Sequence, residues 1–246
     1  MRLALTRLRT TIAFFSSMVA DPQQTQLAEQ LKWLNTHLGI VRDLDVAIER
    51  LNEIDKRRPQ TEYRSWSRER AESQRHLTQA LHSAKYQRLI KSLSHWIEKG
   101  SWSTKGGKQA ATRRACPITQ YSARQLMQWR KKLIKKSRKL EEIGTRKRHR
   151  LRLMNKRFSY AVEAVAGLVE ASEISKLRTT LKVLRKAQRS LGQLNDDARC
   201  RSLAATLGQN SVELSQMFLR PRREKRLIRT AVTAYEKLAE LKPLSI

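Results

Sequence analysis

The apolar residues of this chain recur every three or four positions along most of its length. This spacing places side chains on one face of an α-helix. It runs without interruption over residues 26–55 and predicts further helices in the following segments: 5–19, 63–99, 118–143, 146–165, 177–198, 211–219 and 222–241. No segment shows the sustained alternation of apolar and polar residues that is typical of a β-strand. The sequence therefore predicts an all-α protein.

One part of the helical pattern is repeated. Residues 38–43, which read LGIVRD, are echoed by residues 191–196, which read LGQLND, at an offset of 153. Two degenerate copies of a four-helix unit are therefore expected, comprising residues 1–144 and 145–246. A glycine inside a helix costs about 1 kcal/mol relative to alanine. We therefore expect Gly39 to mark a tight crossing with a neighbouring element.

The charge of the chain is strongly positive. It has 52 Lys and Arg against 22 Asp and Glu, a formal net charge of +30. Such an excess repels itself in a compact fold, so a polyanionic partner that neutralises it is expected. Two helical segments carry basic stripes, and the positions that share a face are His149, Arg152, Lys156 and Tyr160 in one and Arg178, Lys182, Arg185 and Arg189 in the other.

Several functional classes lack their sequence signatures. No apolar run approaches the ~18 residues that span a membrane, so no membrane association is expected. Cys116 and Cys200 lie far apart without metal-ligand spacing, which suggests neither a disulfide framework nor a cysteine zinc site and fits a reducing cytoplasm. There is no P-loop, glycine-rich dinucleotide turn or HExxH motif. No cofactor is expected.

Acidic residues beside the arginines leave an enzymatic alternative open. Carboxylates at Asp43, Asp45, Asp196 and Asp197 could hold Mg²⁺ for phosphoryl chemistry. Paired acids next to dense arginine more often orient guanidinium groups, and we favour that interpretation. His149 could act as a general acid or base. No activated nucleophile or partner for it is evident, so it is better interpreted as one more donor to phosphate.

The tryptophans bear on a second alternative, nucleic-acid binding. Aromatic rings can stack on bases, but four of the five tryptophans lie in predicted helices, where a core role is favoured. Trp102 lies in residues 100–117, which combine three glycines with four basic residues and no periodicity. We predict a mobile basic loop there, with Trp102 as the candidate for base contact.

The repeated segments resemble a known family. The segments RLALTRLR and LKWLNTHLGIVRDLD in the first copy, and HRLRLMNKRFSY and LKVLRKAQRSLGQLNDD in the second, are similar to the CHAD family, the conserved histidine α-helical domain. The resemblance covers nearly the whole chain. It implies two pseudo-symmetric four-helix bundles around a central cationic channel, binding of inorganic polyphosphate and association with polyphosphate granules.

The resemblance also implies which residues bind. They are Arg2, Arg7, Arg9, Lys32 and Arg42 in the first copy, and His149, Arg152, Lys156, Arg157, Tyr160, Lys182 and Arg185 in the second. The chain departs from the family pattern at Thr6 and Ser159, where basic residues are usual. The histidine expected three residues before Arg2 is missing, and Met1 stands inside a helical pattern without a capping residue, so a natural start upstream is expected.

A polyphosphate-binding protein without enzymatic activity is therefore the predicted function. A thin, flexible chain of phosphates without bases can be held by arginine forks and lysine charges in a channel. Nucleic acid is expected to bind more weakly or without specificity, because double-stranded DNA requires a convex element that enters a groove. The expected location is the cytoplasm, including polyphosphate granules.

Overall fold

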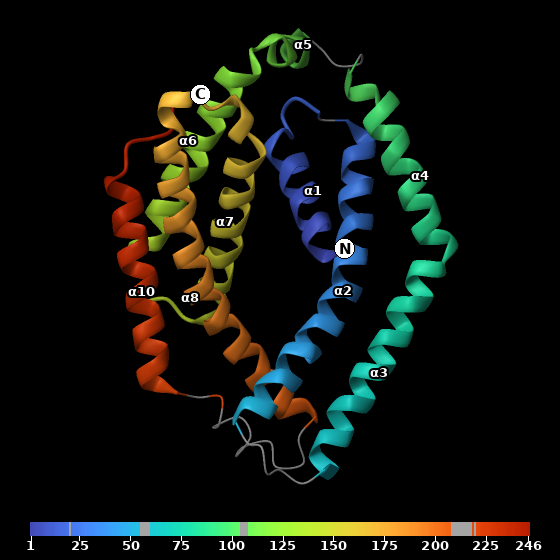
Figure 1. Cartoon of the computed structure of the whole chain (residues 1–246). Coiled ribbons are helices and arrows are strands. Elements are labelled where there is room, and N and C mark those ends of the chain that lie inside the picture. The colour runs from blue at the N-terminus through green and yellow to red at the C-terminus, as the bar shows by residue number, and fades with distance from the viewer. Residues whose placement is uncertain (20, 55–59, 104–107, 208–217, 219) are drawn as a thin grey trace. The chain divides into compact units, whose positions relative to one another are not determined.

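The computed structural model describes the chain except for residues 20, 55–59, 104–107, 208–217 and 219 (Figure 1). The described residues form helices and no strand, so the predicted all-α fold is confirmed. The α-helices are α1 (Arg2–Phe14), α2 (Pro22–Ile54), α3 (Gln60–His82), α4 (Ala84–Lys99), α5 (Lys108–Ala115), α6 (Ile118–Ser137), α7 (Thr145–Ala164), α8 (Ile174–Leu207) and α10 (Pro221–Glu240). Short 3₁₀ turns lie at Ser101–Ser103, Ala166–Leu168 and Ala171–Glu173.

Local capping accounts for two of the helix boundaries that differ from the prediction. Helix α2 begins at Pro22 rather than at residue 26, since proline is tolerated at the first helical position and Asp21 Oδ1 accepts a hydrogen bond from the Gln24 amide at 2.8 Å. The helix predicted over 63–99 is divided at Ser83. The Ser83 backbone is extended, and its Oγ accepts from the Tyr86 amide at 3.2 Å, which starts α4 anew.

The segment predicted as a mobile loop, residues 100–117, contains regular structure. Helix α5 occupies Lys108–Ala115, and a 3₁₀ turn occupies Ser101–Ser103. Alanine, lysine and arginine are good helix formers, and the predicted loop rested on glycines that all precede α5. The helix predicted at 211–219 falls almost entirely outside the described residues.

Contacts divide the chain into two compact units along lines that differ from the repeat. Unit 1 contains Met1–Ala111 and Asp196–Leu219, and unit 2 contains Thr112–Asn195 and Arg220–Ile246. Helix α8 therefore contributes its first part to unit 2 and its last turns to unit 1. The repeat boundary at residues 144 and 145 stays a prediction about sequence copies, because a repeat limit need not coincide with a limit of packing.

The described residues of unit 1 form two apolar clusters. Trp66 of α3 is 1% exposed and packs with buried residues of α2 and of the end of α8: Leu44, Ala47, Leu51, Cys200 and Ala204. The second cluster joins α1, α2 and α4 through Leu5, Leu31, Leu34, Leu89 and Trp96. Beside it, the Trp96 indole donates to Asp21 Oδ2 at 3.0 Å, which ties the start of α2 to α4. The predicted core role is confirmed for Trp66 and Trp96, whereas Trp33 and Trp129 are half-buried.

Gly39 does not lie at a tight crossing. A Cβ atom added there would meet nothing within 4 Å, so the expectation of a close neighbour is wrong. The equivalent Gly192 lies nearer to another element, because its Cβ would come 3.9 Å from Arg152 Nε. That distance is an ordinary van der Waals contact, and neither glycine is required by close packing.

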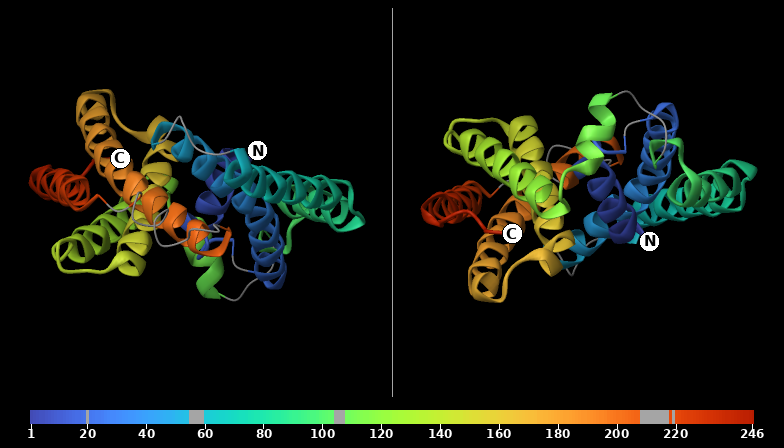
Figure 2. Two further views of the ribbon diagram at one scale, coloured as in Figure 1. Left: turned by 90° about the horizontal axis from the view of Figure 1, so that it is seen from below. Right: turned by 90° about the horizontal axis from the view of Figure 1, so that it is seen from above.

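Unit 2 is a bundle of α6, α7, the first part of α8, and α10 (Figures 1 and 2). Its interior contains buried apolar residues from each helix, among them Leu133, Phe158, Leu184 and Leu238. Arg130 of α6 donates from Nη2 to the carbonyl of Leu238 at 2.7 Å. Because the last carbonyls of a helix lack partners within the helix, this contact caps α10 and joins it to α6.

The buried cysteine gives a test of the unit 1 core. Burial, together with Asp196, Asp197 and Asp43, raises the pKa of Cys200 from 9.0 to about 12. We therefore expect a maleimide to label the half-exposed Cys116 in the native protein at pH 8, and Cys200 only after unfolding. The unfolded Cys200 thiol ionises near pH 9 and the folded thiol near pH 12. The free energy of unfolding should therefore fall as pH rises from 9 to 12, because only the unfolded thiol loses its proton in this range.

Peptide mass spectrometry after short exposure to the reagent separates the two cysteines. A matched sample labelled in denaturant serves as the control for complete reaction. Labelling of Cys200 as fast as Cys116 in the native protein would contradict the packing of the Trp66 cluster.

Candidate anion-binding surface

Helices α7 and α8 are joined by a buried polar contact in unit 2. Asn155 of α7 is fully buried, and its Nδ2 donates to the carbonyl oxygen of Leu184 at 3.0 Å and to Gln188 Oε1 at 3.1 Å. A buried amide with partners on one neighbouring helix favours a single register between the two helices. Asn155 and Gln188 therefore set how the remaining side chains of α7 and α8 meet.

Two further contacts show that the helices run antiparallel. Near the start of α7, His149 Nδ1 lies 2.5 Å from Asn195 Oδ1, late in α8. Toward the end of α7, Glu163 Oε1 accepts from Arg185 Nη2 at 3.2 Å, earlier in α8. The basic stripes predicted on two separate segments thus lie along the same helix pair and overlap over part of their length, where Lys156 and Tyr160 of α7 are at about the level of Arg185 and Arg189 of α8.

The cationic positions lie on the same side of this pair. At ~100° per residue, these positions lie 60–140° around the helix axis from the residue that faces the partner helix, which is Asn155 on α7 and Gln188 on α8. Because the two helices run antiparallel, a rotation in the direction of the sequence leads to the same side of the pair on both helices. We call this group the α7/α8 surface, and its members are His149, Arg152, Lys156 and Tyr160 of α7 and Arg178, Lys182, Arg185 and Arg189 of α8. Five of the eight are exposed, and Arg152, Lys156 and Tyr160 are half-buried.

Few carboxylates balance the charge of the α7/α8 surface. Glu163 pairs with Arg185, whose side chain is still 62% exposed. Within the part of the chain that the structure describes, Arg178, Lys182 and Arg189 form no ion pair. Lys156 Nζ lies 5.6 Å from the centroid of the Tyr160 ring, within reach of a cation–π interaction that leaves the positive charge in place. The surface thus offers several cations to an anionic ligand.

A comparison with protein-family models identifies the family. The model of the CHAD domain matches residues 1–205, which is most of the chain. The chain belongs to the CHAD domain family. CHAD domains are linked to polyphosphate and to triphosphate-tunnel proteins. A comparison with curated proteins gives no match.

The remaining predicted CHAD site residues do not all join the α7/α8 surface. Arg157 follows Lys156 by one position, so it lies ~100° further around α7 and faces away from the surface. In unit 1, Arg2 and Arg9 share one face of α1 and are half-buried, whereas Arg7 lies on another face and is exposed.

Helix α2 of the CHAD domain presents the last two predicted residues. Lys32 and Arg42 are both exposed, and Lys32 Nζ lies 3.5 Å from Glu29 in an ion pair on the helix surface. Exposed pairs of this kind contribute ~0–1 kcal/mol, so Glu29 holds Lys32 only weakly. The channel that the resemblance implies stays a prediction.

The aspartates that suggested a metal site contact arginines. This confirms the interpretation that carboxylates orient guanidinium groups for three of the four: Asp43 with Arg199 at 3.0 Å, Asp45 with Arg70 at 3.0 Å and Asp197 with Arg50 at 3.5 Å. All three pairs lie in unit 1. Over the described ranges, no group of three or more potential metal ligands was found. Over the same ranges, no helix is long and apolar enough to cross a lipid bilayer.

Trp102 has a structural role that the sequence did not suggest. Its indole Nε1 donates to the carbonyl oxygen of Trp96 at 2.7 Å, and it packs against the apolar cluster of α1, α2 and α4. A Cβ atom on Gly100 would lie 2.4 Å from the Trp102 ring, so glycine permits this close approach. The ring therefore helps to cap the end of α4, and its interpretation as a loop residue open to bases is wrong.

Sequence reasoning also missed polar and basic residues that the fold brings together. Gln188 followed the apolar stripe of its helix and was not recognised as the partner of Asn155. A group of cations on α10 and α8 lines a groove in unit 2. The available signal was the spacing of Arg222, Arg226 and Arg229, which places them on one helix face opposite the apolar stripe.

Proposed function

We propose that this CHAD protein binds inorganic polyphosphate and that the α7/α8 surface is part of the binding site. The observation that carries the proposal is the alignment of two basic stripes on one side of an antiparallel helix pair. Because Arg178, Lys182 and Arg189 form no ion pair among the described residues, their charges are not used to hold the fold together. They are available to an anion.

The dimensions and chemistry of the surface suit a phosphate chain. The positions Arg178 to Arg189 cover ~16 Å at ~1.5 Å per residue, enough to contact several successive phosphates. Guanidinium groups donate in pairs to phosphate oxygens, whereas lysines act as compact charges. A ligand that repeats the same charge along a flexible chain requires no recognition of base edges. Association with polyphosphate granules would follow from such binding.

Two other functions receive less support. Nucleic-acid binding rested on Trp102, and that ring packs against the Trp96 cluster instead. Processing of polyphosphate by a metal enzyme rested on four aspartates, three of which contact arginines. We therefore propose binding without turnover, and any hydrolysis must be tested directly.

Competition at matched phosphate concentration tests the proposed ligand. We expect long-chain polyphosphate to displace labelled polyphosphate at least tenfold better than DNA or RNA. The affinity should fall steeply as salt rises, because lysine and arginine contacts release counterions from the ligand. Fluorescence anisotropy over a series of salt concentrations measures both quantities.

The same mixtures with Mg²⁺ or Mn²⁺, assayed for released phosphate, provide the control for turnover. An affinity that hardly changes with salt, or equal competition by DNA, would contradict the proposed function. Phosphate release that is lost in Asp43→Asn would favour the enzymatic alternative.

A further inference from the structure

Helix α10 has a basic face that the family match does not include. The CHAD model ends at residue 205, and α10 spans Pro221–Glu240. One face of α10 is buried against unit 2 and contains Leu227, Ile228, Ala231, Ala234, Tyr235 and Leu238. The opposite face carries Arg222, Arg226, Arg229 and Thr233. Helix α10 therefore presents a cationic stripe directly opposite its core stripe.

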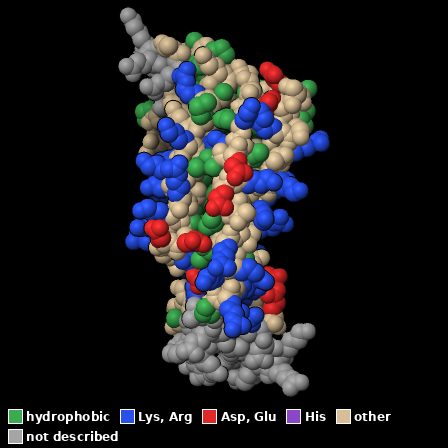
Figure 3. Space-filling model, turned by 90° about the vertical axis from the view of Figure 1, so that its left-hand side faces the viewer, with side chains coloured by type: hydrophobic (Ala, Val, Ile, Leu, Met, Phe, Trp, Pro, Cys, Tyr) green, Lys and Arg blue, Asp and Glu red, His purple; other side chains and the backbone are tan. Residues whose placement is uncertain are grey.

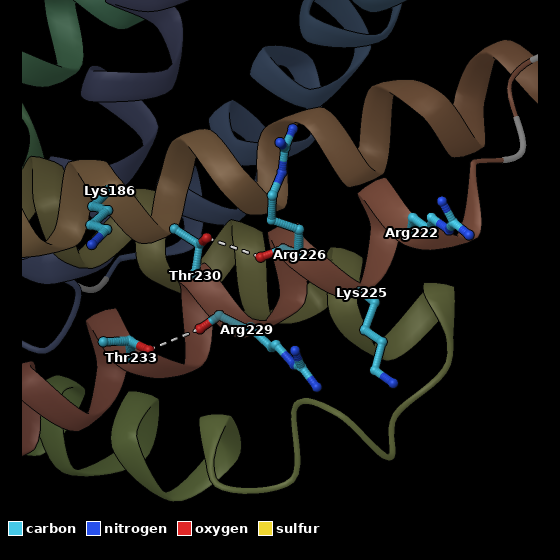
Figure 4. Close-up of a pocket in the computed structure, with 7 residues that line it drawn as sticks. All are labelled: Lys186, Arg222, Lys225, Arg226, Arg229, Thr230 and Thr233. Carbon is cyan, nitrogen blue, oxygen red and sulfur yellow. Dashed lines mark hydrogen bonds between the residues drawn. The ribbon is translucent and has the colours of Figure 1, made fainter.

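This stripe lines a groove with α8. The groove has a volume of about 400 Å³, and its lining residues are Lys186 of α8 and Arg222, Lys225, Arg226, Arg229, Thr230 and Thr233 of α10. Figure 4 shows Lys186 on α8 and the Arg226 side chain extending from α10 toward α8, whereas Lys225 and Arg229 extend to the other side of α10. Among the described residues that line the groove, none carries a carboxylate or an aromatic ring. The charged residues described in the lining are therefore all Lys or Arg.

The five cationic side chains of the groove are not used in ion pairs that stabilise the fold. Among the residues that the structure describes, none of them forms an ion pair. Their neighbours on α10 differ, since Glu224 pairs with Arg148 and Arg223 donates to Gln193 Oε1 at 3.3 Å. Figure 3 shows Lys and Arg side chains gathered on the face of the molecule that includes α10, with fewer Asp and Glu between them.

The arrangement is unfavourable for the isolated helix. Like charges three or four residues apart destabilise a helix by ~0.2–0.5 kcal/mol per pair. Cations in the first turns of a helix also oppose its dipole, which favours negative charge at that end. An anion bound in the groove would relieve both effects.

The chemistry of the lining identifies the class of anion. Three guanidinium groups and two ammonium groups suit phosphate oxygens. The absence of rings from the lining removes the stacking that single-stranded nucleic acids use. Arg222 and Arg229 are seven positions apart, or ~10 Å along the helix, which is the scale of a few linked phosphates.

We propose that the groove between α8 and α10 is a second phosphate-binding site, which takes a short linear oligophosphate or a few consecutive units of a polyphosphate chain. Lys186 lies one helical turn from Lys182 and next to Arg185, so α8 borders both the groove and the α7/α8 surface. A long chain can occupy both, whereas tripolyphosphate fills one. The polyphosphate part of this inference rests on the proposed function, and the oligophosphate part does not.

Three charge-matched variants test the groove. The groove variant is Lys225→Gln, Arg226→Gln and Arg229→Gln. The surface variant is Arg178→Gln, Lys182→Gln and Arg189→Gln. The control variant is Lys131→Gln, Lys132→Gln and Lys136→Gln, which removes three exposed lysines of α6 in the same unit. Calorimetric titration with tripolyphosphate and with long-chain polyphosphate, after circular dichroism confirms equal helix content, gives affinity and stoichiometry.

The groove variant is expected to bind one tripolyphosphate fewer per chain than the wild type and to lose about tenfold in affinity for long chains. The control variant should keep the stoichiometry and lose much less. Hydrogen exchange of the wild type gives a second readout that needs no substitution, since tripolyphosphate should slow exchange in residues 221–233.

Equal losses in the groove and control variants, or unchanged exchange in residues 221–233, would overturn the groove site. The proposed function is tested by a separate result. If the surface variant binds long-chain polyphosphate as the wild type does, the α7/α8 surface is not the binding site, whatever the groove variant shows.

Discussion

Changing Arg152, Lys156, Lys182 and Arg185 together to glutamine is expected to weaken polyphosphate binding by about 4 kcal/mol or more, roughly a thousandfold. Each charge-assisted contact contributes ~1.5–3 kcal/mol, and the contributions within one surface are not additive. The α7/α8 surface holds these four residues on one side of a helix pair whose register is set by Asn155. Their charges therefore act on the same stretch of ligand.

The control removes the same charge from another helix of unit 2. Lys131, Lys132, Lys135 and Lys136 of α6 are exposed, and their change to glutamine lowers the net charge equally. We expect less than about a tenfold loss, because exposed charges without a formed site act weakly and are screened by salt. Fluorescence anisotropy at fixed salt compares the variants, provided that circular dichroism is unchanged. If both sets reduce affinity equally, net charge alone attracts the ligand.

Trp66→Ala is expected to lower the free energy of unfolding by about 3–5 kcal/mol. The Trp66 side chain is 1% exposed and fills the space between α2, α3 and the last turns of α8. Its removal loses the burial of a large ring and leaves a cavity that the neighbouring helices can fill only in part. Denaturant unfolding followed by circular dichroism measures the change.

Trp33→Ala is the matched control. Trp33 is half-buried, and Lys85 Nζ lies 4.3 Å from the centroid of its ring, a cation–π contact of ~0.5–1 kcal/mol at an exposed site. We expect less than half of the loss found for Trp66. Comparable losses would mean that the Trp66 cluster contributes no more than an ordinary partly buried contact.

The arginine–aspartate pairs of unit 1 show that residue types alone do not distinguish a phosphoryl-transfer site from a structural ion pair. A carboxylate next to arginine has the composition of a phosphoryl-transfer site as well as that of a structural ion pair. Here Arg199 and Arg70 lie 3.0 Å from Asp43 and Asp45, and Asp43 contributes to the raised pKa of the buried Cys200. These aspartates therefore link α2 to α8 and to α3 through partly exposed ion pairs.

Much of the fold followed from local pattern. Apolar spacing predicted the long helices, because a face buried along its whole length must recur every three or four residues. The same periodicity predicted that His149, Arg152, Lys156 and Tyr160 share a face, and that Arg178, Lys182, Arg185 and Arg189 share another. Both assignments depend only on the geometry of a single helix. The break between helices at Ser83 and the short helix Lys108–Ala115 were not predicted, because capping residues and short helices leave little periodic signal.

By itself the sequence determined the all-α class, the CHAD family, the excess of positive charge and the basic faces of individual helices, since each depends on residue types and on spacing along one helix. Tertiary structure decided which faces meet. The antiparallel register of α7 and α8, the contacts of Asp43 with Arg199 and of Trp102 with Trp96, and the groove that joins Lys186 to α10 all bring together residues distant in sequence. Packing between helices creates these contacts, and no periodicity along one helix specifies them.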